Sequence, residues 1–214
     1  MTLSELPYAL TSVDKVNAML GFTTGASASQ DQLIADIIAS MTDYIEGYCG
    51  GRRFLSTTYT EVMNIERTTY LFLSQRPATA VSSVKYRTGL PSSPAWVDYY
   101  SNGYLVYLGA GMIRFFSKFT QFPQAFQVQY TAGYLIDWAA YNDPTQHTLP
   151  RDLTLACTEL AAKVFNLRNS IGTYQEATEG QSVTYESDRY QSALNDQIKT
   201  TLNKYKISRV AVAV

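Results

Sequence analysis

The hydrophobic period of this sequence changes from helical to strand-like at one point, the glycine pair Gly50 and Gly51. Before the pair, the segment SQDQLIADIIASMTDYIEGYC repeats apolar residues at helical spacing, and Ser29 is its predicted N-cap. After the pair, FLSTTYTEVM is rich in β-branched and aromatic residues. Because glycine readily ends a helix, a helix is predicted to pass directly into a sheet here, with Arg52 and Arg53 at the junction.

The middle of the chain, from about Phe54 to Tyr134, consists of short β-branched and aromatic runs separated by Pro, Gly and Asn. This pattern predicts five to seven strands. The turns SNG at 101–103 and GAG at 109–111 both lie between hydrophobic runs, which is typical of hairpin connections.

Helices are predicted on both sides of this region. A short helix covers 12–20, with Ser12 as its N-cap and Gly21 as its stop. The clearest helix follows Pro150, in RDLTLACTELAAKVFNLRN. After a polar loop, SIGTYQEATEGQSVTYES, the segment DRYQSALNDQIKTTLNKY predicts a last amphipathic helix.

The two longest helices each carry a strong apolar stripe, and neither stripe can remain in water. The stripes are therefore predicted to pack against each other and to form the core. The residues concerned are Ile37, Ile38, Met41 and Ile45 in the first helix and Leu153, Cys157, Leu160 and Val164 in the second.

The fold class predicted from this order is α+β, a helical bundle from the N- and C-terminal segments with an inserted antiparallel β-rich region. Residues 1–51 and 135–205 form the bundle, 52–134 the β insert and 206–214 a C-terminal arm. The arm is too apolar for a solvated terminus. It is expected to add as a strand to a partner's sheet edge or to fold back on the β insert. Its apolar residues are Ile207, Val210, Val212 and Val214.

Composition favours a protein that assembles with others. The 17 Lys and Arg residues against 18 Asp and Glu give no basis for wrapping nucleic acid by charge. Tyrosine, present 17 times, suits surfaces that are buried against a partner. Cys49 and Cys157 are expected to be buried, reduced thiols. No signal peptide and no apolar run long enough to cross a bilayer is found, so a cytosolic chain without membrane contact is expected.

The sequence shows no recognisable catalytic constellation, and no catalytic, metal-binding or cofactor-binding residue is predicted. The single histidine, His147, is expected on the surface of a loop, near Asp143 and Asp152. The acidic residues of the second helix have no histidines beside them and are expected to form a solvated face. They are Asp36, Asp43 and Glu46.

Arg52 and Arg53 are interpreted as a hinge between the bundle and the β insert. The C-terminal end of a helix is a negative pole that favours cations, so a helix cap or an ion pair within or between subunits is expected. Binding of nucleic-acid phosphate is the alternative.

Four segments, in this order, resemble the tailed-bacteriophage head-tail connector proteins, also called head-completion or adaptor proteins. They are DQLIADIIASMTDYIEGYCGGRRF, LSQRPATAVSSVKY, FQVQYTAGY and LPRDLTLACTELAAKVFNLRN. The order extends over about residues 12–170. Each motif alone is weakly specific, whereas the ordered set is fairly specific. The chain departs from the family at Ala78 and Thr79, where valine is commoner, and in a longer β region.

The resemblance implies a structural virion protein without enzymatic activity. It would form a homo-oligomeric ring, with twelve subunits expected, beneath the portal protein in the neck between head and tail. The ring would complete the DNA-filled head and provide the platform for a tail or neck protein, with genomic DNA passing through its lumen without specific binding. Before assembly the chain would be in the host cytoplasm.

Two other functions stay open at this point. One is a tail-completion protein of the same virion. The other is a small hydrolase that uses His147 with Asp143 or Asp152.

Overall fold

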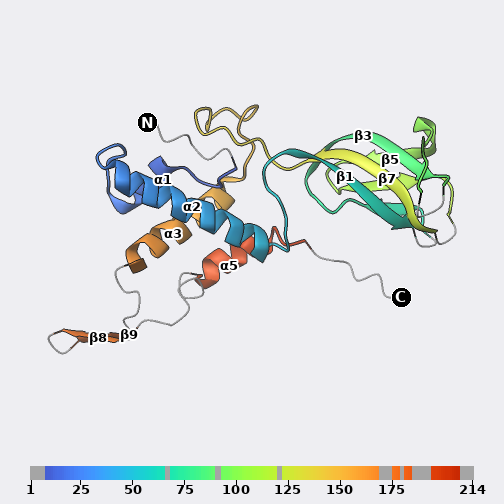
Figure 1. The fold of residues 1–214 in the computed structure, drawn as a ribbon. Coiled ribbons are helices and arrows are strands. Elements are labelled where there is room, and N and C mark those ends of the chain that lie inside the picture. The colour runs from blue at the N-terminus through green and yellow to red at the C-terminus, as the bar shows by residue number, and fades with distance from the viewer. Residues whose placement is uncertain are drawn as a thin grey trace. The chain divides into compact units, whose positions relative to one another are not determined.

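The computed structural model describes residues 8–65, 68–89, 93–119, 122–168, 175–178, 181–184 and 194–207. The chain forms two compact units, Met1–Arg52 with Ile136–Val214 and Arg53–Leu135. The first unit holds the α-helices and the second is built from antiparallel strands (Figure 1). This separation of helices from antiparallel sheets confirms the α+β class.

In the first unit, one of the described helices contacts all the others. The structure describes α1 (Val13–Leu20), α2 (Ala28–Tyr48), α3 (Arg151–Leu167) and α5 (Asp196–Asn203). Helix α3 contacts each of the other three. Seven of the eight predicted core residues are confirmed, because they are buried at 3% exposure or less where α2 contacts α3, whereas the prediction is wrong for Ile37, which is only half buried. Among the described residues, no helix has both the length and the hydropathy needed to cross a membrane.

Glycines end both N-terminal helices, as predicted. Helix α1 begins after the N-cap Ser12 and ends at Gly21, whose φ is 75°. Helix α2 is followed by Gly50 and Gly51, with φ of 88° and 79°. The N–H of Gly51 donates to the carbonyl of Glu46 at 2.9 Å, which satisfies a carbonyl that the helix end would leave unpaired.

The predicted N-cap of α2 is wrong by two residues. Ser27, not Ser29, accepts a hydrogen bond from the backbone N–H of Gln30, so the helix begins at Ala28. The preceding loop explains the choice. The carboxylate of the buried Asp31 accepts the N–H of Gly25 at 2.7 Å and so holds the loop against the first turn.

The C-terminal segment differs from the prediction in two places. The predicted polar loop contains a two-stranded antiparallel hairpin, β8 (Gln175–Thr178) and β9 (Gln181–Thr184). The last helix starts later than predicted because the Asn195 side chain accepts the N–H of Ile198 at 2.8 Å and caps it there. Leu194 therefore precedes the helix, and Tyr190 lies outside the described residues.

The second unit is a sandwich of two antiparallel sheets. Among the residues that the structure describes, seven strands run from Thr57 to Ala132, which is within the predicted number. They are β1 (Thr57–Ile65), β2 (Tyr70–Phe72), β3 (Ala78–Arg87), β4 (Trp96–Asp98), β5 (Tyr104–Tyr107), β6 (Met112–Phe115) and β7 (Phe122–Ala132). One sheet has the order β1-β7-β3-β4 and the other β2-β6-β5. Strands β1, β7 and β3 lie side by side in Figure 1.

Buried side chains from both sheets form one core between them. They include Ile65, Leu71, Val84, Ile113, Phe115, Phe126, Val128 and Tyr130.

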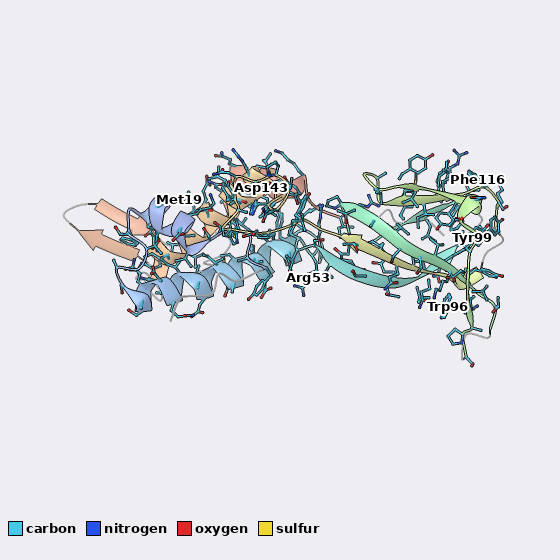
Figure 2. The ribbon with its side chains drawn as sticks, turned by 90° about the horizontal axis from the view of Figure 1, so that it is seen from above. Met19, Arg53, Trp96, Tyr99, Phe116 and Asp143 are labelled. Atoms are coloured by element: carbon cyan, nitrogen blue, oxygen red, sulfur yellow. The ribbon has the colours of Figure 1, made fainter. Side chains whose placement is uncertain are left out.

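One of the two predicted hairpins is confirmed and the other is wrong. Strands β5 and β6 pair on either side of GAG. The SNG segment is a 3-10 turn, Ser101–Gly103, between β4 and β5, which belong to different sheets. The chain passes from one sheet to the other here because the Tyr99 ring packs on Phe115 and Phe126, at centroid distances of 5.3 and 5.8 Å. Figure 2 shows Tyr99 at the end of this unit that is farther from Arg53.

The segment that enters the β unit, 54–56, is hydrogen-bonded to the segment that leaves it, 133–134. This pair of segments is here called the seam. The N–H of Tyr134 donates to Phe54 O at 2.7 Å, and the N–H of Ser56 donates back to Tyr134 O at 2.8 Å. Gly133, the residue before Tyr134, has φ of 113°, and a Cβ there would lie 2.5 Å from Leu55 O. The glycine of the TAGY motif is therefore required by this close approach of two backbones.

Candidate assembly surfaces

Arg52 is part of a set of contacts that hold the segment after α5 against the end of α2, here called the C-terminal clasp. The Nη1 of Arg52 donates to the backbone carbonyl of Tyr205 at 2.8 Å, and its guanidinium lies 5.7 Å from the Tyr205 ring. The N–H of Ile207 donates to Cys49 O at 3.0 Å. Arg52 is only 9% exposed, so its contacts stabilise the interior of the helical unit.

Asp152 on α3 completes the C-terminal clasp. Its carboxylate accepts the hydroxyl of Tyr205 at 2.5 Å and lies 3.4 Å from the ammonium of Lys204. Burial alone would raise the pKa of Asp152, but hydrogen bonds from Tyr205, Lys204 and the Leu153 N–H outweigh it and lower the pKa below its usual range. The ionised carboxylate is therefore the form that the folded chain favours.

Arg53 belongs to the other unit, since the boundary between the two falls between Arg52 and Arg53. Its backbone N–H donates to the side-chain oxygen of Gln75 at 3.0 Å. The N–H of Gln75 donates in turn to the buried hydroxyl of Tyr130, which donates to Glu61 at 2.6 Å. Desolvation and the bond to Glu61 raise the pKa of Tyr130, so the phenol stays protonated and keeps this chain of bonds.

The predicted C-terminal arm is described only at its start. Ile207 is half buried and bonded to Cys49, while Val210, Val212 and Val214 lie outside the described residues. The role of these four residues in partner binding stays a prediction.

His147 is buried, at 6% exposure, so the prediction of a surface histidine is wrong. Its loop folds over it. The Trp138 and Tyr141 rings lie 4.7 and 4.9 Å from the imidazole centroid, and Nδ1 lies 2.9 Å from Asp137 O. Tyr141 in turn carries the Lys15 ammonium 3.5 Å from its ring centroid.

The residues of the alternative hydrolase are not brought into a catalytic arrangement. The Asp143 carboxylate accepts hydrogen bonds from Thr145 and Gln146, and that of Asp152 accepts from Tyr205 in the C-terminal clasp. Cys49 and Cys157 are free and buried, as predicted. Burial raises their pKa values to about 11 and about 12, so both thiols stay protonated. Within the described ranges no group of histidine, cysteine and acidic side chains could hold a metal ion.

A surface that sequence analysis missed lies on the three-stranded sheet. Its solvent-facing residues are Tyr70 and Phe72 on β2, Met112 and Arg114 on β6, and Leu105 and Tyr107 on β5, here called the aromatic face. The strand register places them in two adjacent rows, because Arg114 pairs with Tyr70 and Leu105, and Met112 pairs with Phe72 and Tyr107. Phe72 is 54% exposed and Leu105 46%.

The other sheet of the sandwich presents a mostly polar surface, in which Val62 is 48% exposed. The outward residues of its three long strands include Thr58, Thr60, Gln127, Gln129, Ser83 and Lys85. A sheet with one solvated face normally alternates apolar with polar residues, as this one does. The segments YLF and YLVY do not alternate, since apolar residues occupy both their faces. This lack of alternation is the sequence signal that could have predicted an apolar outer face.

The outer face of α2 carries acidic and apolar side chains together. Asp36 and Asp43 are exposed, as predicted, whereas Glu46 is buried at 7% exposure. Leu33 is 42% exposed, and Ile37 and Tyr44 on the same side are half buried. The sequence of α2 contains no lysine or arginine.

Comparisons with known proteins found one family model and chains of similar fold. A family model described as "Head completion protein" matches residues 9–208. A chain from the neck of an empty gene transfer agent (GTA) particle, computed with C6 symmetry, aligns with a TM-score of 0.58 and 17% identity, covering 98% of this chain and 97% of that one.

A chain from the virion of a native GTA particle aligns over the same shares at a TM-score of 0.57 and 17% identity. At this identity the two alignments show a shared fold. No curated protein matches the sequence. The family match covers nearly the whole chain, and the chain therefore belongs to the head completion protein family.

Proposed function

We propose that this chain is a structural protein of a virion neck, where its helices form a bundle, its copies form a ring, and the ring joins a DNA-filled head to a tail. The observation that carries this proposal is the family match over residues 9–208. The fold shared with chains of GTA particles, one of them a neck chain, supports it. We further propose a portal protein above the ring, a tail or neck protein below it, and a ring of twelve subunits.

The ring requires that one face of a subunit bind a different face of the next subunit. DNA passing through its lumen must not be gripped by bulk charge, and a net charge of −1 agrees with this requirement. The position of Arg52 and Arg53 at the boundary between the two units is consistent with a hinge that lets each unit take its place in the ring. Neither arginine side chain is assigned a DNA contact in this proposal.

The proposal is tested by removing the protein and by locating it. Cells that produce particles without this chain should accumulate DNA-filled heads that lack tails, and supplying the chain in trans should restore joined particles. Cryo-electron microscopy of the complete particle should then show a ring of this fold between portal and tail. Normal particles without the chain would contradict the proposal, and density on the tail side alone would favour a tail-completion protein.

A further inference from the structure

The aromatic face of the β unit has the composition of a protein-binding surface. Tyrosine and arginine are enriched where binding energy concentrates, and contiguous exposed apolar patches mark interaction sites. Here three aromatic rings, Leu105 and Met112 surround Arg114. The outward face of the opposite sheet is mostly threonine, glutamine and serine, with Val62 as an exposed apolar residue on β1, and it has no comparable row of aromatic rings among the described residues.

The charge of this face is positive. The Arg114 guanidinium lies 6.0 Å from the centroid of the Tyr70 ring, and that of Arg76 lies 6.0 Å from the Phe72 ring. Within the described part of the chain, Arg114 is exposed and forms no ion pair. A matching surface should therefore present carboxylates beside apolar side chains.

The outer face of α2 has this complementary chemistry. Leu33, Ile37 and Tyr44 follow one another at helical spacing, and Asp36 and Asp43 flank them. The helix has no basic residue to neutralise these acids. Within the described residues, neither Asp36 nor Asp43 forms an ion pair.

The dimensions of the two faces also agree. Three strands about 4.8 Å apart make a sheet roughly 10 Å wide between its outer strands, which is about the width of one helix. Asp36 and Asp43 are about 10 Å apart along α2, from a rise of about 1.5 Å per residue. Tyr70 and Phe72, which carry the two guanidiniums, are about 7 Å apart along β2. Flexible arginine side chains can span this small difference.

We propose that the outer face of α2 in one copy binds the aromatic face of β2, β6 and β5 in a second copy. The contact joins unlike surfaces, so it repeats from copy to copy and can close a ring. Apolar side chains from both faces would lie at its centre, and the two aspartates would pair with Arg114 and Arg76. This interface deepens the proposed ring and rests on that function for its biological setting, but it can be measured in the isolated protein.

Cysteine cross-linking tests the contact between copies. Ser40→Cys lies on the outer face of α2 and Met112→Cys on the aromatic face, and neither substitution removes a charge. The native Cys49 and Cys157 are buried, so they give little background. When the two full-length variants are mixed at high concentration and oxidised, a disulfide-linked dimer should form. The matched control mixes Ser40→Cys with Gln129→Cys, which lies on the polar sheet.

Charge reversal separates contacts between copies from a contact within one chain. Arg114→Glu alone and Asp36→Lys with Asp43→Lys should each weaken self-association about tenfold or more, measured by sedimentation velocity. A mixture of these two proteins should associate again, because each reversed face then meets an opposite charge on its neighbour. Lys85→Glu, on the polar sheet, should leave association unchanged.

Four outcomes would overturn the interface. A dimer yield no higher than with Gln129→Cys excludes the contact, as does wild-type protein that stays monomeric at every concentration. Self-association restored in one chain that carries all three charge reversals, but not in the mixture, would show that the two faces touch within a single chain. Loss of particle joining by Arg114→Glu without any cross-link assigns the aromatic face to another virion protein. If the copies cross-link but the protein is absent from particles, the neck function fails and the interface stands.

Discussion

At the residue scale, Asp152 shows how one carboxylate fastens segments that are distant in sequence. Its hydrogen bonds to Tyr205 and Lys204 connect α3 to the segment after α5, and Arg52 holds the same segment from the end of α2. The segment 204–207 is therefore held against the end of α2 and the first turn of α3. An acidic residue paired in the folded chain makes this fixation dependent on pH.

The lowered pKa of Asp152 gives a prediction with a definite sign. Its stabilising effect is complete above the unfolded pKa of about 3.9 and is lost as the pH falls through the still lower folded pKa. Because Asp152 is partly exposed, Asp152→Asn should cost only about 0.5–1 kcal/mol at pH 7, or about 1–4 °C in Tm. The difference from wild type should shrink below about pH 3.

Thermal unfolding at a series of pH values measures this difference. Asp43→Asn is the matched control, because Asp43 is an exposed carboxylate on α2 without an ion pair among the described residues. If Asp152→Asn and Asp43→Asn followed the same pH dependence, the carboxylate of Asp152 would not fasten the C-terminal clasp.

At the element scale, the seam between 54–56 and 133–134 holds the two ends of the β unit together. Gly133→Ala should destabilise this unit by at least about 1–3 kcal/mol, since a positive φ strains any side chain and the new Cβ would press on the Leu55 backbone. Gly109→Ala is the control, because a Cβ at Gly109 would have no atom within 4 Å. Urea unfolding followed by circular dichroism compares the two variants. Equal midpoints would show that the seam tolerates a side chain.

Elements whose ends depend on local chemistry were predictable from the sequence. The stop at Gly50 and Gly51 and the cap at Ser12 need only neighbouring backbone groups, and the sequence shows them directly. The SNG turn was misjudged because its path depends on Tyr99 entering a core made of distant rings. The burial of His147 likewise depends on Trp138 and Tyr141 folding over it.

The candidate surfaces were less predictable than the fold. The position of Arg52 after a glycine stop is visible in the sequence. Its partner Tyr205 is not, because it lies more than 150 positions away. The aromatic face was missed because five of its six residues are apolar and apolar residues in a strand suggest a core. Only the assignment of strands to two sheets shows which of them face solvent.

At the scale of the whole molecule, the C-terminal clasp holds the start of the predicted partner-binding arm. Ile207 is the last residue with a described contact, through its N–H to Cys49 O. A truncation that tests the arm must therefore retain Ile207. Cutting earlier would remove the carbonyl and hydroxyl of Tyr205 from the clasp or the bond of Ile207, and would confuse folding with docking.

Removing residues 208–214 should leave the folded chain intact and abolish joining to portal-bearing heads, because alternate apolar residues in this segment can add as a strand to a partner's sheet edge. The expected result is a Tm unchanged within about 1 °C together with unjoined heads, counted by electron microscopy. The matched substitutions in the full-length chain are Val210→Asp with Val212→Asp, which should also block joining, and Ala211→Ser with Ala213→Ser, which should not. A lower Tm after the truncation would favour a strand folded back on the chain's own β unit. Normal joining with a normal Tm would leave neither role for the segment.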